Sequence, residues 1–73
     1  MIIITGGGSN NSYTHTQSNA STIWDIQHNL GFNPNVTVVD SSGQKMLTDV
    51  YYTDINNLKI IVANAFAGIA YLS

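Results

Sequence analysis

The 73-residue chain contains no cysteine and no arginine, and only 8% of its residues are charged. The absence of cysteine excludes disulfide bonds and thiolate zinc sites. A chain of this length buries only about 60% of the surface that its unfolded form exposes, so that a lone hydrophobic core is marginal. Small domains of this kind need a further source of stability. We therefore expect oligomerisation to provide it.

Charge of either sign is scarce, because the charged residues are two lysines and four aspartates with a net charge of −2. An average soluble domain carries about 25% charged residues. A protein that binds DNA or RNA needs lysine or arginine to neutralise phosphates, so nucleic acid is not an expected partner. Polarity comes instead from Asn, Ser, Thr and Gln, which suits tightly packed subunits in which unpaired charges would be costly to desolvate.

Long hydrophobic runs are also missing. No segment reaches the roughly 18–20 apolar residues of a membrane-spanning helix, and the first residues, MIIITGGG, lack the basic start of a secretory signal peptide. We therefore expect no membrane partner. The short run of Ile2, Ile3 and Ile4 is instead typical of an exposed edge that pairs with another chain. Residues 1–8 are predicted to form an apolar docking tag with a glycine joint.

The polar stretch SNNSYTHTQSNAS follows this tag and has no helical period. Its composition predicts an extended arm or linker over residues 9–20. In an extended arm, Tyr13, His15 and Gln17 share one side. These three residues, with the isoleucines of the tag, are therefore the candidate assembly and docking residues.

From residue 21 onward, strand and turn signals alternate. Trp24, Ile26 and His28 recur at every second position, which predicts a strand with these side chains on one face. Further strands are predicted over residues 36–40, 46–53, 58–62 and 69–72, with a loop at 29–35, turns at 40–43 and 54–57, and a bend at 64–68. Turns at intervals of about 8–12 residues predict an all-β domain over residues 21–73, a small antiparallel β-sandwich or barrel of about five strands.

No motif for catalysis stands out. Ser42, His28 and Asp40 have the residue types of a catalytic triad, but the chain has no G-x-S-x-G sequence. Asp40 and Asp54 are explained by capping of their own turns. We therefore predict that the chain is not an enzyme and needs no cofactor.

The histidines and the aromatic residues each allow two interpretations. In a threefold assembly, three copies of His15 could meet and bind a transition metal. The alternative is a hydrogen-bonding role for His15 and a core or rim position for His28, and on balance we predict no metal site. The aromatic side chains form either a sugar-stacking surface or core and cross-strand pairs.

A series of short motifs runs in order from Tyr13 to the end of the chain. The series reads YTHTQS, STIWDIQHNLGFNPNVTVVDSSGQ, VYYTDINNLKIIV and AFAGIAYLS. It resembles a small β-module found at the ends of tail-fibre, baseplate and related virion proteins of tailed bacteriophages. The residues taken to specify its fold are Trp24, Ile26, His28, Asn29, Leu30, Gly31, Pro34, Asp40, Gly43 and Tyr71.

This resemblance implies a folding and assembly unit that occurs in trimeric or otherwise repeated virion parts. No catalytic residue set comes with it. The expected partners are further copies of the chain, as a homotrimer, and other virion proteins. The expected location is the virion, assembled in the host cytoplasm.

The position of the chain on a virion stays open at this point. The module normally ends a longer fibre or baseplate chain, whereas here only the arm and the tag precede it. If the chain is a complete gene product, we expect a capsid decoration protein, a neck or tail component, or a fibre tip or adaptor. The alternative function is a receptor-binding tip whose exposed aromatic residues contact host surface glycans.

Overall fold

The computed structural model describes residues 11–73 as one antiparallel β-sheet of five strands. The prediction of a small all-β fold is therefore confirmed. The predicted docking tag, including Ile2, Ile3 and Ile4, lies outside the described residues. The strands are β1 (Tyr13–Gln27), β2 (Val36–Asp40), β3 (Lys45–Met46), β4 (Asp49–Asp54) and β5 (Asn57–Leu72). The structure describes no helix in this part of the chain that is long and apolar enough to cross a membrane.

The long strand β5 organises the sheet. Along one side it pairs with β1, from Gln27 opposite Asn57 to Tyr13 opposite Leu72. On its other side, β4 pairs with the first part of β5 and β2 pairs with the last part. The short strand β3 extends the sheet beyond β2. The long strands β1 and β5 thus run through the whole sheet, and β4 and β2 follow one another along the same side of β5.

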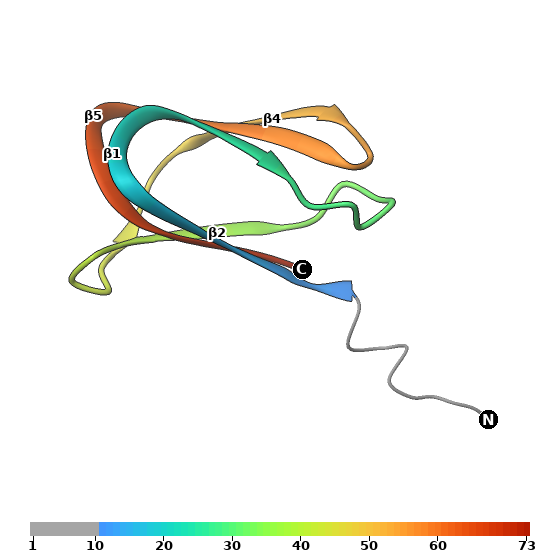
Figure 1. Cartoon of the computed structure of the whole chain (residues 1–73), viewed down its shortest axis with the longest axis horizontal. Helices are drawn as coiled ribbons and strands as arrows, with labels where there is room; N and C mark the ends of the chain where they lie inside the picture. Colours follow the sequence, from blue (N-terminus) through green and yellow to red (C-terminus); the bar gives the residue numbers. More distant parts are fainter. Residues whose placement is uncertain (1–10) are drawn as a thin grey trace.

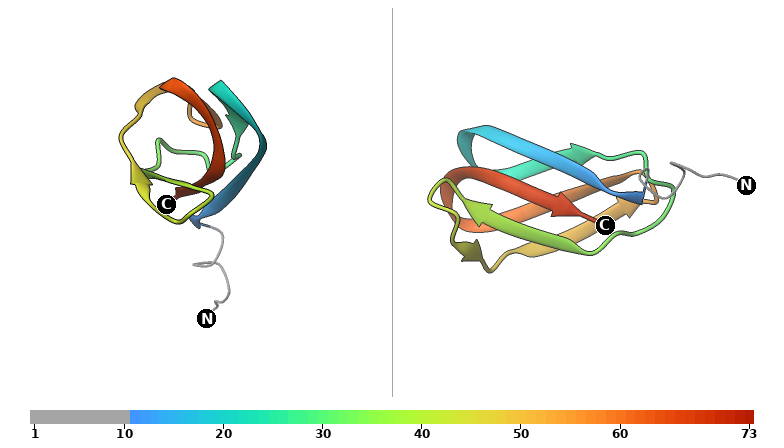
Figure 2. Two further views of the ribbon diagram at one scale, coloured as in Figure 1. Left: turned by 90° about the vertical axis from the view of Figure 1, so that its left-hand side faces the viewer. Right: turned by 90° about the horizontal axis from the view of Figure 1, so that it is seen from below.

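The sheet is folded over on itself at the middle of β1 and β5 (Figure 1). One layer contains β4 with the adjoining halves of β1 and β5, and the other contains β2 with the remaining halves. Seen along its length, the sheet curls around a common interior (Figure 2). At the bend, the register between β1 and β5 shifts on both sides of Ser21, which lies opposite Phe66. Such irregularities bend a strand and increase its twist.

The hydrophobic core lies between the two layers. Its buried members are Trp24, Ile26, Val38, Leu58, Ile60, Val62, Ala70 and Leu72. They come from both halves of β5 and from β1 and β2, so neither layer has a core of its own. The predicted alternation in β1 is confirmed, because Trp24, Ile26 and His28 are buried whereas Asp25 and Gln27 are exposed.

The predicted boundary between arm and domain is wrong, because β1 begins at Tyr13 and passes through residue 21 without a break. Residues 13–17 pair with the last residues of β5 as a regular part of the sheet. The low complexity of the arm concealed a strand whose partner lies almost 60 positions away in the sequence. Side chains alternate between the two faces of the strand as expected, since His15 and Gln17 are half-buried and Thr14 and Thr16 are exposed.

The predicted bend at residues 64–68 does not separate two strands. β5 continues through it, so the predicted strands at 58–62 and 69–72 are the two ends of one bent strand. Gly68 permits the close approach of β2 at this point, because a Cβ on Gly68 would lie 2.0 Å from the carbonyl oxygen of Val39. Small residues therefore mark a crowded part of the sheet rather than a turn.

The predicted loop at residues 29–35 and the predicted turn at residues 40–43 are confirmed by their backbone angles. Asn29 and Gly31 have φ of 56° and 79°, and Gly43 has φ of 90°. These values fall in the left-handed region, which glycine and, to a lesser degree, asparagine tolerate. Pro34 is buried in the loop between β1 and β2, where the following residue, Asn35, pairs with Ser73 through two 3.0 Å backbone hydrogen bonds.

Candidate functional site

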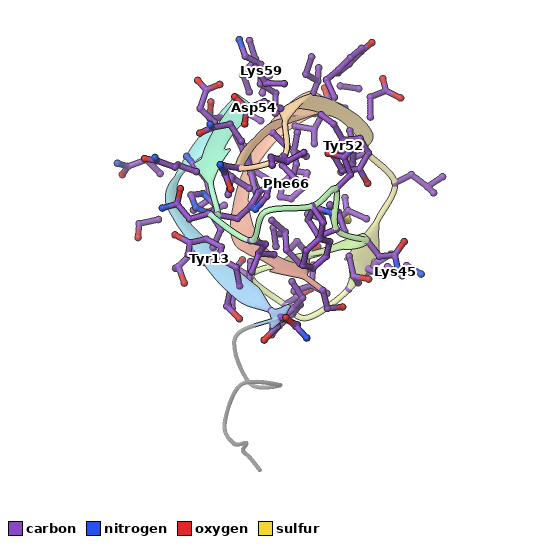
Figure 3. The ribbon with its side chains drawn as sticks, turned by 90° about the vertical axis from the view of Figure 1, so that its right-hand side faces the viewer. Tyr13, Lys45, Tyr52, Asp54, Lys59 and Phe66 are labelled. Carbon is purple, nitrogen blue, oxygen red and sulfur yellow. The ribbon has the colours of Figure 1, made fainter. Side chains whose placement is uncertain are left out.

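Three aromatic rings meet on the inner side of the bend. Trp24 is fully buried, with its ring centroid 5.3 Å from that of Phe66 at 65° and 6.0 Å from that of His15 at 47°. Figure 3, which looks into the molecule from the end opposite the bend, shows Phe66 between the two layers. The edge-to-face arrangement of Trp24 and Phe66 is favourable for two aromatic rings. Trp24 is therefore a core residue and is not available for stacking on a sugar.

His15 takes the hydrogen-bonding role that was one of its two interpretations. Its Nε2 lies 2.8 Å from Oε1 of Gln17, and the Nε2 of Gln17 donates to the carbonyl oxygen of Asn19 at 3.0 Å. The chain of side chains follows the inner face of β1 up to the bend. Residues 11–73 contain no group of three or more His, Cys, Asp or Glu side chains that could hold a metal ion.

His28 is buried at the end of the fold remote from the bend. Its Nδ1 accepts a 3.0 Å hydrogen bond from the backbone N–H of Leu30, and its buried Nε2 has no partner in the described residues. Burial lowers the pKa of His28, and the nearby Asp54 carboxylate opposes this with a smaller effect. The imidazole is consequently held in its neutral form, with the proton on Nε2.

Asn56 attaches the loop after β1 to the turn between β4 and β5. Its carbonyl oxygen accepts the backbone N–H groups of His28 and Asn29, at 2.9 and 3.1 Å. Its Oδ1 accepts the N–H of Gly31 at 3.0 Å. No role was predicted for Asn56, because nothing in the sequence relates the turn at residues 54–57 to the HNLG motif.

The two turn aspartates act as predicted. Oδ1 of Asp40 accepts hydrogen bonds from the N–H and hydroxyl of Ser42, at 2.9 and 2.6 Å, and from the N–H of Gln44 at 3.0 Å. These bonds lower the pKa of Asp40, the Ser42 hydroxyl most of all. Asp54 accepts from the backbone of Asn56 and the side chain of Asn57, which lower its pKa in the same way. Both carboxylates are thus occupied by their own turns.

Tyr52 connects β4 to the loop that contains Pro34. Its hydroxyl donates a 2.6 Å hydrogen bond to the carbonyl oxygen of Pro34. In Figure 3, Tyr52 and Tyr13 lie on opposite sides of the open end of the fold. Tyr51 lies beside Lys59 on the outer face of the sheet, so the two neighbouring tyrosines point to opposite faces.

An open strand edge is the largest backbone feature available for assembly. In the described structure, β1 pairs only with β5, so the other edge of this 15-residue strand has no strand beside it. Its side chains include one charge, that of Asp25, and no proline. Tyr13, His15 and Gln17, the predicted assembly residues, all lie on this strand. His15 and Gln17 are half-buried, whereas Tyr13 is 37% exposed, so His15 and Gln17 offer mainly the backbone edge to a partner.

A second feature is an apolar cleft on the opposite side of β5. It lies between residues 46–49, where β3 ends and β4 begins, and residues 61–66 of β5. Two adjoining depressions of about 250 and 360 Å³ make it up, and both are lined by Leu47, Val62 and Ala63. Leu47 is 98% exposed beside them. The cleft was not predicted, because it forms only where the folded sheet leaves β2 and β4 apart.

A third feature is a depression on the outer face of β1, β4 and β5. It has a volume of about 310 Å³, and Asp25, Gln27, Thr53, Asn57 and Lys59 contribute to its lining. Asp25 and Lys59 are directly opposite each other on neighbouring strands, with 3.8 Å between their charged groups. The exposed ring of Tyr51 lies opposite Lys59 on the other side. Hydrogen-bonding groups and an aromatic face therefore occur together here.

Two further residues of the predicted motif occupy different environments. Tyr71 lies on the outer face of the sheet and is 47% exposed, and Leu30 is half-buried against the core. Comparisons of the chain with known protein families, with curated proteins and with solved structures find no match.

Proposed function

We propose that the chain is a non-enzymatic structural module of a tailed-bacteriophage virion. It self-associates, as a trimer, and docks on the capsid, neck or tail as a decoration, fibre or adaptor component. The virion setting rests on the sequence resemblance described above. Self-association rests on the open edge of β1, which is the single observation that carries this function.

The edge of β1 is unusual because it has few of the features that keep strand edges apart. Proteins commonly block such edges with lysine, proline, inward-pointing charges or a covering segment. Over its 15 residues, β1 has no lysine and no proline, and only the irregularity at Ser21 interrupts its pairing with β5. A partner strand that adds to this edge would satisfy its free backbone groups.

The side chains near this edge also favour contact with protein. Ile23 on β1 is 48% exposed, next to the half-buried Ile61 of β5. The outer face beyond the bend carries Thr14 and Tyr71 on adjacent strands. Because these surfaces have few charges, little energy is lost in desolvating ions when a second subunit covers them.

The test is the oligomeric state of the full chain by native mass spectrometry and light scattering. Thr16→Lys places a charge at an exposed position of β1 and should convert the oligomer to a folded monomer. Thr37→Lys is the matched control, since Thr37 is also exposed but β2 has strands on both sides. A wild-type chain that is a stable, folded monomer would refute self-association. In phage particles, deletion of residues 1–8 should abolish incorporation, and normal incorporation would refute docking through the tag.

A second candidate function is recognition of a host surface glycan, as part of a receptor-binding tip. The observation in its favour is the depression on the outer face beside Tyr51. Sugars are bound by a combination of aromatic faces and neutral or charged hydrogen-bonding groups, and Gln27, Asn57 and Asp25 surround this depression. Tyr51→Ala should then abolish binding on a glycan array, while Tyr71→Ala, which removes an exposed ring from the other layer, should not. Equal binding by both variants, or none by the wild type, would refute this function.

A further inference from the structure

The sheet has a gap on the side of β5 where β4 and β2 pair with it. The last residue of β5 opposite β4 is Ile61, and the first opposite β2 is Gly68. Residues 62–67 therefore have no strand partner on this side within the described structure. The short connection through Leu47 and Thr48 spans the gap without pairing. This part of β5 is a second, much shorter open edge.

The apolar cleft lies directly at this gap. The smaller depression is lined by Met46, Leu47, Val62, Ala63, Asn64, Ala65 and Phe66, and the larger one by Leu47, Thr48, Asp49, Ile61, Val62 and Ala63. Val62 is buried and Phe66 is half-buried, so the cleft opens onto the side of the hydrophobic core. Of the residues in the described range 11–73 that line it, only Asp49 is charged.

The chemistry of the cleft favours a short extended peptide over a small molecule. Sites for small molecules bring several polar groups together around a cavity of about 300–1,000 Å³. Among the described residues, the depression of about 250 Å³ has only Asn64 as a polar side chain, and the one of about 360 Å³ has only Thr48 and Asp49. Free backbone groups on β5 are suited to strand addition, in which main-chain hydrogen bonds bind the peptide and adjoining pockets take alternate side chains. The occupant should therefore be uncharged, β-branched and a few residues long.

We propose that this cleft binds residues 2–4 of a second copy of the chain. Ile2, Ile3 and Ile4 are uncharged and β-branched, and Thr5 extends the run to four residues, which fits within the gap of residues 62–67. Isoleucine side chains would cover Leu47 and Phe66 and close the side of the core. The inference rests on the proposed self-association. It names residues 2–4 as the segment that binds and the cleft as the site that receives this segment.

The position of Tyr13 explains why a second copy is the occupant. Tyr13 pairs with Leu72, six residues along β5 from Phe66, which corresponds to about 20 Å. β1 runs toward the bend from this point, and it lies on the opposite side of β5 from the cleft. Ile4 is nine residues before Tyr13, and nine extended residues span at most about 30 Å. To place Ile4 in the cleft of its own copy, the chain before Tyr13 would have to reverse direction, return to the bend and cross β5. This path would use the entire length.

The absence of cysteine allows a direct test in the full chain by site-specific cross-linking. Ile3→Cys and Ala65→Cys are made separately, and equal amounts are mixed and treated with a short bismaleimide. Ala65 is exposed and lines the cleft, so this substitution leaves the core intact. We expect a covalent heterodimer joined through the two introduced cysteines, identified by peptide mass spectrometry. Thr37→Cys, exposed on β2 away from the cleft, is the matched control and should give at least tenfold less heterodimer.

The double variant Ile3→Cys/Ala65→Cys distinguishes the two sources of the segment. Diluted into excess wild-type chain, it should give no intramolecular cross-link, because its own segment enters a wild-type cleft and wild-type segments fill its cleft. A persistent intramolecular cross-link would overturn the inference by showing that each copy fills its own cleft. Heterodimer yields no greater than those of the Thr37→Cys control would overturn it as well. If native mass spectrometry still shows an oligomer in that case, the proposed function stands without this contact, whereas a monomeric wild type refutes both.

Discussion

The indole N–H of Trp24 donates a 3.0 Å hydrogen bond to the backbone carbonyl of Ser21, three residues earlier in the same strand. Ser21 lies between the two register shifts of β1, and its hydroxyl also bonds the carbonyl of Ile23 at 2.8 Å. Trp24 therefore has two roles, because it fills the core between the layers and holds the strand at the point where the sheet folds over.

Trp24→Phe is expected to lower the free energy of unfolding by about 2 kcal/mol. The change leaves the Ser21 carbonyl without its donor, which costs about 1–3 kcal/mol when the group is buried, and it removes part of a buried ring. Urea unfolding followed by circular dichroism measures the effect. Tyr71→Phe is the control at an exposed position and should stay within about 0.5 kcal/mol of the wild type. Equal stabilities of the two variants would contradict a structural role for the indole N–H.

Gly68→Ala is expected to destabilise the fold by about 1–3 kcal/mol, the range for overpacking a tightly packed site. The added Cβ would meet the carbonyl oxygen of Val39, a backbone atom that moves only with β2 itself. Gly43 differs from Gly68, because an added Cβ would meet no neighbouring atom there. At Gly43 the φ of 90° is what disfavours other residues. Asparagine tolerates positive φ better than alanine does. Gly43→Asn should therefore be milder than Gly43→Ala, whereas Gly68→Asn should be worse than Gly68→Ala in thermal unfolding.

His28 should make the protein less stable in mild acid. Burial lowers its pKa in the folded state below the value of about 6.5 expected in the unfolded chain. The stability that the neutral His28 side chain contributes is therefore complete above pH 6.5. It is lost as the pH falls toward the folded pKa, because the unfolded state takes up the proton first. The free energy of unfolding should fall by at most about 1.4 kcal/mol per pH unit in this window.

His28→Asn separates this titration from the loss of a hydrogen bond, since asparagine retains an acceptor for the N–H of Leu30. The variant should show a flatter dependence of unfolding free energy on pH just below 6.5, as measured in urea at a series of pH values. His15→Gln removes the other imidazole and serves as the control. If the wild-type slope survives in His28→Asn and disappears in His15→Gln, the assignment to His28 is wrong.

Asp40→Ala should lower the melting temperature more than Asp40→Asn does. Alanine removes all three hydrogen bonds that Oδ1 accepts within the turn, whereas asparagine keeps a carbonyl oxygen at the same place. Because the folded pKa of Asp40 is lowered, its contribution is complete above the ordinary carboxyl pKa and is lost as the pH falls through the folded value. The difference in melting temperature between wild type and Asp40→Asn should therefore shrink in strong acid. A constant difference would contradict a stabilising role for the charge of Asp40.

Tyr52→Phe is expected to cost about 1 kcal/mol, the usual net contribution of one hydrogen bond. It removes the donor to the carbonyl oxygen of Pro34 and so releases the loop between β1 and β2 from β4. Hydrogen exchange should become faster at the amides of Leu30 and Gly31 in this loop. Tyr51→Phe, one residue away on the outer face, is the matched control. Unchanged exchange in Tyr52→Phe would show that Asn56 alone holds the loop.

Local patterns predicted much of this structure. The period of two around Trp24 placed three side chains on one face, and the positions of Gly31, Asp40 and Gly43 identified the loop and turn. These features depend on interactions within a few residues, such as positive φ at glycine and an aspartate that caps its own backbone. The same patterns failed at residues 13–20, where polar residues form a strand because the end of β5 provides a partner.

The candidate sites likewise combine features that the sequence predicts with features that arise only when the sheet folds. The sequence by itself determined a cysteine-free β-domain with few charges and an apolar run at Ile2, Ile3 and Ile4, since composition and alternation are properties of the chain alone. Only the tertiary structure decided that β5 remains one strand through its bend, that β1 is left with an open edge, and that a gap opens between β2 and β4. The physical reason is that these features arise from pairing between distant residues and from folding one sheet around a shared core.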